Sequence, residues 1–455
     1  MTHVIYTKHQ ICTKEFIIEA RTEAYRLVKR GIAGIAITVI AAGCATTDRS
    51  QILVEGKKGK QWYKGNTHTH TLWSDGDAAP EWAVSWYKEH GYDFLSITDH
   101  NIVLHGEKTV AISADSKVTP ERLEQLHDKF GHDHVEVTPG KNGGEVMHLK
   151  TLEELRDRFE ERGSFLLVEG EEITGRTHVN GINIRKRIRQ SKADDNVVSM
   201  REQIDAVNEQ SDELSVPMFA HIDHPNWSRA ISAEDILQVP QGRYFEVFNG
   251  HGGVRNWGSE KLRIPDTDKK WDIILAHRIA SDPDAMMYGV ATDDTHTYFV
   301  SGAGHQIPGR GWSMVLAKRL TAKSLVRAYL RGDFYSSAGV TLSRIEWDDS
   351  SFTVEPETES GVGYTTQFIG TRKGFDTESS PALDDDGNPM PNRTRLYSDD
   401  IGEILYETTD VPAVYKFQGN ELYVRAKIVS TKLKDQPYQE GDVEVAWTQP
   451  VVPGQ

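Results

Sequence analysis

The chain has 455 residues and a mass of 51.2 kDa, which at ~150 residues per domain suggests two or three domains. Hydrophobic residues make up 38% and charged residues 26%, which argues against a collagen, a long disordered chain or a polytopic membrane protein. With 52 Lys and Arg against 68 Asp and Glu, the formal net charge is −16, and no nucleic-acid partner is expected. Both cysteines, Cys12 and Cys44, precede the globular part, so the fold has no disulfide and no cysteine-based zinc site.

The N-terminus has the pattern of an export signal. A basic pair precedes a 13-residue run of small and apolar side chains, Gly31–Gly43, which is too short to span a hydrocarbon core of ~30 Å. The run ends in Ala-Ala-Gly-Cys44, which resembles a bacterial lipobox. We therefore expect residues 1–43 to be a lipoprotein-type signal peptide and Cys44 to carry a lipid anchor, so that the exported protein faces the periplasm or cell surface. A short buried helix is the alternative.

From residue 61 to about residue 340, short apolar runs alternate with amphipathic helical patterns, after a polar tether at 44–60. The expected strands are 64–70, 93–98, 164–169, 178–184, 216–222, 243–248, 287–292 and 312–317. The expected helices are 79–90, 151–162, 200–210, 233–237 and 321–331. This alternation predicts βα units in a parallel sheet or barrel, interrupted by an insertion at 103–150.

After residue 340 the pattern changes to short segments of period two, without any helical pattern. The expected strands are 351–355, 365–369, 413–417, 422–429 and 443–447, with an acidic loop over roughly 375–400. In the fourth strand Leu422 and Val424 share one face, and Tyr423, Arg425 and Lys427 share the other. The sequence thus predicts a small all-β domain over 341–455, whose expected role is packing.

Polar residues recur at the ends of the predicted strands, which form the active face of a β/α barrel. They are His68, His70, Asp75, Asp99, His100, Glu171, Glu172, His178, His221, His224, Asp294 and His296. His68 and His70 are two positions apart on one strand, so both imidazoles face the same side. A lone His-x-His is weak evidence, but this repetition at successive strand ends indicates a site.

The residue types indicate more than one metal ion. Six imidazoles and three carboxylates exceed the three or four protein ligands of one catalytic zinc. Nine ligands suit two or three divalent ions, and nitrogen and oxygen donors without thiolate favour Zn, Mn or Fe over copper(I).

These residues also form motifs in a recognisable order. They are His68-x-His70 with Ser74-Asp75-Gly76, Thr98-Asp99-His100, Gly170-x-Glu172, His178, Ala220 to Pro225 with His224, and Asp294-x-His296. The set resembles the polymerase and histidinol phosphatase (PHP) family of metal-dependent hydrolases, over residues 61–340. The resemblance is nearest to a branch with carbaryl-hydrolase-like enzymes, which cleave a carbamate. It implies an α/β fold, a distorted seven-stranded β/α barrel, followed by the small β domain.

The resemblance also implies how the ligands are shared. His68, His70, Glu172 and Asp294 would hold one metal, and Glu172 would bridge to a second held by His178 and His224. Asp75, His100 and His296 would hold a third. His221 has no clear ligand position; we expect it to support the ligands rather than bind a metal itself, and it is also a candidate substrate contact.

The implied mechanism is hydrolysis by a metal-bridging hydroxide, with Glu172 and Asp294 as catalytic carboxylates. Expected substrate contacts are Arg176, Asn180, His221, Asn249, His251 and Arg255, all near strand ends. Three functions compete: a phosphoesterase acting on a small phosphate ester, a hydrolase of carbamates, amides or carboxylic esters on the same metals, and a non-catalytic metal-binding surface lipoprotein. The full ligand set argues against the last, and the sequence favours the first only weakly because few Arg or Lys lie at strand ends.

Overall fold

The computed structural model describes residues 51–54, 59–141, 143–227 and 231–454. The predicted signal peptide, Cys44 and most of the predicted tether lie outside the described residues. Among the helices that the structure does describe, none has the length and apolar character needed to cross a membrane.

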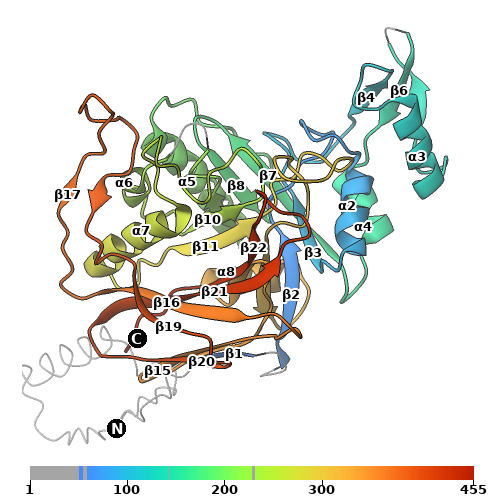
Figure 1. Cartoon of the computed structure of the whole chain (residues 1–455). Coiled ribbons are helices and arrows are strands. Elements are labelled where there is room, and N and C mark those ends of the chain that lie inside the picture. Colours follow the sequence, from blue (N-terminus) through green and yellow to red (C-terminus); the bar gives the residue numbers. More distant parts are fainter. Residues whose placement is uncertain (1–50, 55–58, 142, 228–230, 455) are drawn as a thin grey trace, which may run out of the picture. The chain divides into compact units, whose positions relative to one another are not determined.

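A mixed sheet of 13 strands organises the chain, in the order β11-β10-β9-β8-β7-β3-β2-β12-β13-β22-β21-β16-β19 (Figure 1). The strands are β2 (Gln61–Asn66), β3 (Phe94–Ile97), β7 (Leu166–Thr174), β8 (His178–Ile182), β9 (Phe219–Ile222), β10 (Tyr244–Asn249), β11 (Tyr288–Thr292), β12 (Trp312–Ala317), β13 (Phe334–Ala338), β16 (Tyr364–Arg372), β19 (Glu403–Thr408), β21 (Glu421–Leu433) and β22 (Val443–Thr448). Strands β2, β3 and β7 are parallel, as are β9, β10 and β11, while β8 is antiparallel to both its neighbours. The α/β class is therefore confirmed, in a sheet that is mixed rather than parallel throughout.

The segments that follow β2 and β11 meet at the carboxyl ends of these strands. Thr69 and Thr295 form a parallel bridge. The Asp294 amide donates to the His68 carbonyl at 3.0 Å, and the His70 amide donates to the Thr295 carbonyl at 2.9 Å. These bonds join two distant parts of the sheet at one end, so residues that follow different strands lie side by side.

Seven described helices connect or cover the strands. They are α2 (Pro80–Glu89), α3 (Pro120–Phe130), α4 (Leu152–Phe159), α5 (Asn196–Leu214), α6 (Ala233–Leu237), α7 (Thr267–Ser281) and α8 (Ala322–Arg331). Helix α4 begins with a capping box in which Thr151 accepts from the Glu154 amide. Helix α7 is missing from the predicted elements because it is buried on most sides and so lacks the polar stripe of a surface helix.

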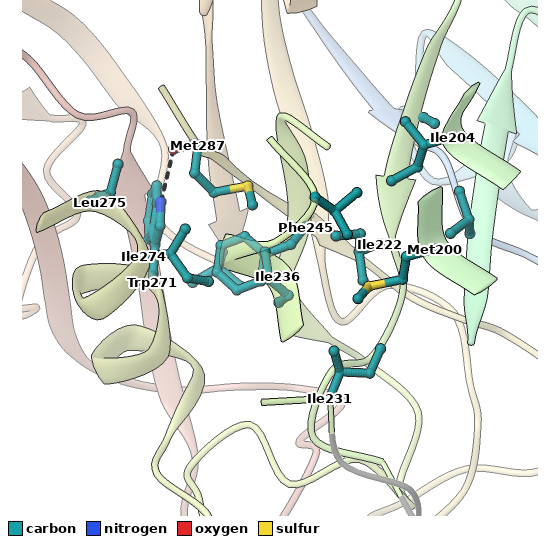
Figure 2. Packing of buried hydrophobic residues seen from close by; sticks show 14 of the residues in the cluster. Met200, Ile204, Ile222, Ile231, Ile236, Phe245, Trp271, Ile274, Leu275 and Met287 are labelled. Carbon is teal, nitrogen blue, oxygen red and sulfur yellow. Dashed lines mark hydrogen bonds between the residues drawn. The ribbon is translucent and has the colours of Figure 1, made fainter. Parts of the chain in front are cut away.

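The largest apolar cluster packs helices α5, α6 and α7 against strands β9, β10 and β11 (Figure 2). Trp271 of α7 and Phe245 of β10 are both fully buried there. The Trp271 indole also donates to the Met287 carbonyl at 2.9 Å, so its one polar atom is paired. This packing fixes the strands whose carboxyl ends carry part of the polar cluster.

The predicted insertion forms a small unit of its own within the fold. It contains α3 and a three-stranded sheet of β4 (Thr109–Ile112), β6 (Glu145–His148) and β5 (Val137–Pro139). Its apolar residues, including Leu126, Phe130 and Met147, share a buried cluster with Leu155 of α4. The insertion is therefore anchored through α4 to the region around the first strands.

The strands after residue 340 continue the sheet that precedes them, because β22 pairs with β13. Others form separate sheets: β14 (Leu342–Trp347), β15 (Ser351–Pro356) and β20 (Ala413–Lys416) with β1 (Gln51–Val54), and β17 (Ser379–Ser380) with β18 (Leu396–Tyr397). No helix occurs among the described residues from 341 to 454, in line with the period-two pattern.

A buried ion-pair network ties β21 to α7. Arg425 is fully buried, and its Nε and Nη2 atoms donate to Asp272 at 2.8 and 2.6 Å. Its Nη1 lies 3.0 Å from Asp268, which also pairs with Lys427 at 2.7 Å. The Tyr423 hydroxyl donates to Asp272 at 2.8 Å. The polar face of β21 thus packs on a helix instead of facing water.

Replacing Arg425 with Met should destabilise the protein strongly, because Asp272 would remain buried without its cation. We expect the free energy of unfolding to fall by ~3–5 kcal/mol. Arg372→Met is the matched control on the neighbouring strand, since its pair with Glu403 is half exposed and should contribute ~1 kcal/mol or less. Denaturant unfolding of both metal-loaded variants measures the difference, and equal losses would contradict the role given to this network.

Candidate metal centre

Local backbone geometry aims several polar side chains at the carboxyl end of the sheet. His68 follows β2, and its amide is held by the Asn66 side chain at 2.8 Å. Asp294 and His224 have φ angles of 49° and 27°, in the left-handed region that non-glycine residues rarely adopt. Such strain persists only where the surrounding structure holds it, and it is common at functional sites.

Four side-chain atoms from three strand ends converge on one point. His68 Nε2 lies 3.4 Å from Glu172 Oε2 and 3.3 Å from Asp294 Oδ1. His70 Nε2 lies 3.2 Å from each of the same two oxygens. Ligands placed ~2.05 Å from an ion at the corners of a tetrahedron are ~3.4 Å apart. The four imidazole–carboxylate distances therefore match the spacing of ligands around one ion, and His68, His70 and Glu172 form a candidate metal group.

Three of these four atoms make no hydrogen bond within the protein. Both imidazole Nε2 atoms and Glu172 Oε2 are buried and make no hydrogen bond. Buried polar atoms are otherwise almost always paired, because an unpaired one costs several kcal/mol of desolvation (~1–3 per group). A divalent cation would satisfy all of them at once, so the residues present fit a metal.

Glu172 faces a second group of imidazoles with its other oxygen. Glu172 Oε1 lies 2.5 Å from His178 Nδ1 and 3.4 Å from His224 Nε2. One carboxylate thus has one oxygen on each side, which is the geometry that a bridging ligand requires. His100 Nδ1 also approaches Glu172, with 2.8 Å to Oε2.

A third group lies nearer the surface. Asp75 Oδ1 lies 3.3 Å from His296 Nε2, and Asp75 Oδ2 lies 3.5 Å from His100 Nε2. His70 turns its Nδ1 toward Asp75 at 3.8 Å, and these four residues form a candidate metal group. His100 therefore lies between the second and third groups, and the nine predicted ligands all lie in this one cluster.

Glu246 supports two of the ligand residues through hydrogen bonds and was not predicted from the sequence. Its Oε1 lies 2.7 Å from His68 Nδ1, so it fixes the ring that presents Nε2 to the cluster. Its Oε2 accepts from the His224 amide at 2.6 Å and from Asn249 at 2.7 Å. The signal in the sequence is a single Glu within the apolar strand Phe245–Phe248, which is rare unless the charge is paired.

The predicted substrate contacts fall into two groups. His251 lines the cavity above the cluster, and Arg176 lines an adjoining cavity, where its Nε donates to Asn196 at 2.8 Å. His221 and Asn249 are fully buried instead. Asn249 donates to Asp294 Oδ2 at 3.0 Å and so supports a predicted ligand, whereas His221 Nδ1 lies 2.8 Å from Asp223.

Of the other two predicted contacts, Asn180 is also fully buried, on β8. Arg255 does not line the cavity above the cluster, and the Asn226 side chain donates to its carbonyl at 3.0 Å.

The surroundings of the two central carboxylates keep them ionised. Burial raises the pKa of Glu172, but the charges of His100, His178 and His68 outweigh it and hold that pKa well below its usual range. Burial likewise opposes ionisation of Asp294, yet the charge of His68 and the close approach of His70 lower its pKa well below normal. Both groups are therefore carboxylates at neutral pH, as metal ligands must be.

A cavity of about 420 Å³ opens above the cluster. Its lining residues are Asp75, Asp77, His100, Lys117, Glu172, His178, His224, Trp227, His251, Asp294, His296, Thr297 and Gln306. Lys117 comes from the insertion, and its ammonium donates to the carbonyls of Asp75 and Gly76. Among the described lining residues it is the only Lys or Arg. Lys117, Trp227 and Gln306 were not foreseen, because nothing local in the sequence places loop residues over a site.

Comparisons with known proteins give little beyond the geometry. No family model and no curated protein matches the chain. Among solved structures it is similar to a two-domain protein from Bacteroides vulgatus that contains a predicted PHP-like metal-dependent phosphoesterase. The identity is 14%, over 87% of this chain and 95% of that one, with a TM-score of 0.37. So loose a match carries no argument, and the resemblance to the PHP family and to its carbaryl-hydrolase-like branch remains a prediction.

Glu172→Gln should lower the number of metal ions bound per chain. The neutral amide lacks the negative charge with which the carboxylate would bridge two cations. Glu171 is the matched control, since it points away from the cluster and accepts from the Ile188 amide at 2.7 Å. We expect more than one divalent ion per chain in the wild type and in Glu171→Gln, and fewer in Glu172→Gln. Elemental analysis of folded, metal-replete protein decides, and the reverse ranking would show that the wrong carboxylate is assigned.

Proposed function

We propose that the protein is a metal-dependent hydrolase that cleaves a small phosphate ester. The observation that carries this proposal is the convergence of three buried ligand atoms that make no hydrogen bond, His68 Nε2, His70 Nε2 and Glu172 Oε2. The last belongs to the carboxylate that also faces His178 and His224. Purely structural metal sites are closed by their protein ligands, whereas this cluster forms the floor of an open cavity.

Divalent cations held by these residues would lower the pKa of bound water and so supply hydroxide near neutral pH. The chain's own groups would position the reaction. Asn249 holds Asp294 through its Oδ2 at 3.0 Å, which orients that carboxylate to accept a proton from the attacking water. Glu246 keeps the ring of His68 in place in the same way.

His251 has the properties of a hydrogen-bond donor to substrate. Burial lowers its pKa to about 4, so the ring is neutral at pH 7. The Gly253 amide donates to His251 Nδ1 at 2.9 Å, which leaves the proton on Nε2. A neutral imidazole donor suits an ester oxygen of either a phosphate or a carboxylic acid derivative.

The charge of the cavity bears on the choice of substrate. A phosphate dianion is stabilised by cations, and three metal sites beside Lys117 would supply them. The alternative is a carbamate, amide or carboxylic ester hydrolase on the same cluster. It is supported by the absence of any arginine among the described lining residues, since such substrates carry no charge to neutralise.

Removing the metals should abolish hydrolysis, and adding Zn²⁺, Mn²⁺ or Fe²⁺ to the chelated protein should restore it. The metal-loaded protein is screened on phosphate mono- and diesters, carbamates and aryl esters. We expect turnover of phosphate esters, lost in Glu172→Gln and kept in Glu171→Gln. Turnover of carbamates alone would select the alternative, and a metal-loaded protein without any turnover would leave a binding protein.

We also propose that the mature protein is a membrane-anchored lipoprotein, on the sequence of its N-terminal segment. Cys44→Ser should then move the protein from the membrane fraction to the soluble exported fraction. Fractionation of cells that express either form tests this. A variant that stays membrane-bound, or a wild type that remains in the cytoplasm, would contradict the anchor.

A further inference from the structure

A second cavity, of about 390 Å³, shares no residue with the cavity above the metal cluster. It lies where α2, the strands β2 and β12, and the turn between β21 and β22 come together. Its lining residues are Lys64, Trp86, His90, Tyr92, Pro308, Gly309, Trp312, Ala338, Gly339, Lys434, Asp435, Gln436 and Glu444. Neither the predicted site residues nor the proposed reaction uses any of them.

Two lysines in this cavity form no close ion pair with a described carboxylate, although Asp293 acts on both from farther away. The Lys434 ammonium is buried and makes no hydrogen bond to the described residues, and it lies 4.3 Å from the centroid of the Phe248 ring. The Lys64 ammonium lies 4.1 Å above the Tyr92 ring and 4.2 Å above the Trp312 ring. Burial lowers the pKa of both lysines, that of Lys434 to about 8.

Such an arrangement is costly for the unliganded protein. A buried ammonium without a partner loses its hydration and gains no ion pair in return. Rings below an ammonium offset only part of this loss. A bound anion would offset the rest, which makes the two lysines a receptor for negative charge.

One part of the cavity wall is aromatic. Trp86 stacks on His90 at 3.8 Å with an interplanar angle of 10°, and Trp312 and Tyr92 form another aromatic pair. Flat aromatic faces favour a flat ring as partner. Of the two carboxylates in the lining, Glu444 pairs with Lys432 at 3.3 Å and Asp435 is exposed at the edge.

We propose that this cavity binds a planar aromatic ring that carries a carboxylate. The ring packs on the tryptophan faces, and the carboxylate accepts from Lys434 and Lys64. This site is independent of the proposed hydrolysis, because no lining residue belongs to the metal cluster.

Calorimetric titration of the metal-loaded full chain tests the proposal with four probes. 2-Naphthoate has both ring and charge, 2-naphthamide has the ring alone, cyclohexanecarboxylate has the charge without a planar ring, and inorganic phosphate is a bare anion. We expect 2-naphthoate to bind about tenfold or more tightly than each of the others, since each lacks one of the two recognised features. No binding of 2-naphthoate, or equal binding of 2-naphthamide, would overturn the proposal.

Two variants locate the bound probe. Lys434→Met should weaken 2-naphthoate by about tenfold while leaving hydrolysis unchanged, and Lys373→Met, an exposed lysine outside the cavity, should change neither. Lys434→Met should also melt no lower than the wild type, because it removes an unpaired buried charge; if it does not fold, Lys64→Met serves instead. Binding that is lost on chelation but unaffected by either lysine variant would place the probe on the metals and refute the second site.

Discussion

The buried carboxylates and imidazoles of the metal cluster set the main constraint on this structure. Glu172 and His68 are fully buried, and their facing atoms find no partner in the protein. Such a cluster costs free energy unless cations occupy it, so the fold must hold the ligands in place against their own electrostatic repulsion and desolvation. The strained backbone of Asp294 and His224 is part of that cost.

The fold meets this constraint with buried polar groups placed behind the ligands. Glu246 and Asn249 fix His68 and Asp294, and Asp99 accepts from the Thr71 amide in the turn after His70. Similar groups hold the loops. Lys270 donates to Asn226 and to the Ile231 carbonyl, each at 2.5 Å, and so fastens the loop that follows His224.

Arg310 holds further loops in place through hydrogen bonds. It also links them to the C-terminal part of the chain. It is almost fully buried and donates to the carbonyls of Gly250, Gly302 and Pro437 at 2.8, 2.9 and 2.7 Å. Together with the Arg425 network on α7, this contact gives the strands after residue 340 a structural part in the site, although none of them lines the cavity.

The sequence by itself determined the local elements and the chemistry of the cluster. Period-two and helical patterns predict most strands and helices because side-chain burial follows the backbone repeat, and histidines and carboxylates at strand ends indicate metal because few other sites need them. Only the tertiary structure decided which groups support the ligands. Glu246 lies in an apolar strand, Lys117 lies in an insertion, and α7 lacks a polar stripe, so their roles arise from contacts distant in sequence. For the same reason the sequence could not place His221, which is fully buried beside Asp223 and does not line the cavity, because the packing of β9 against its neighbours buries it.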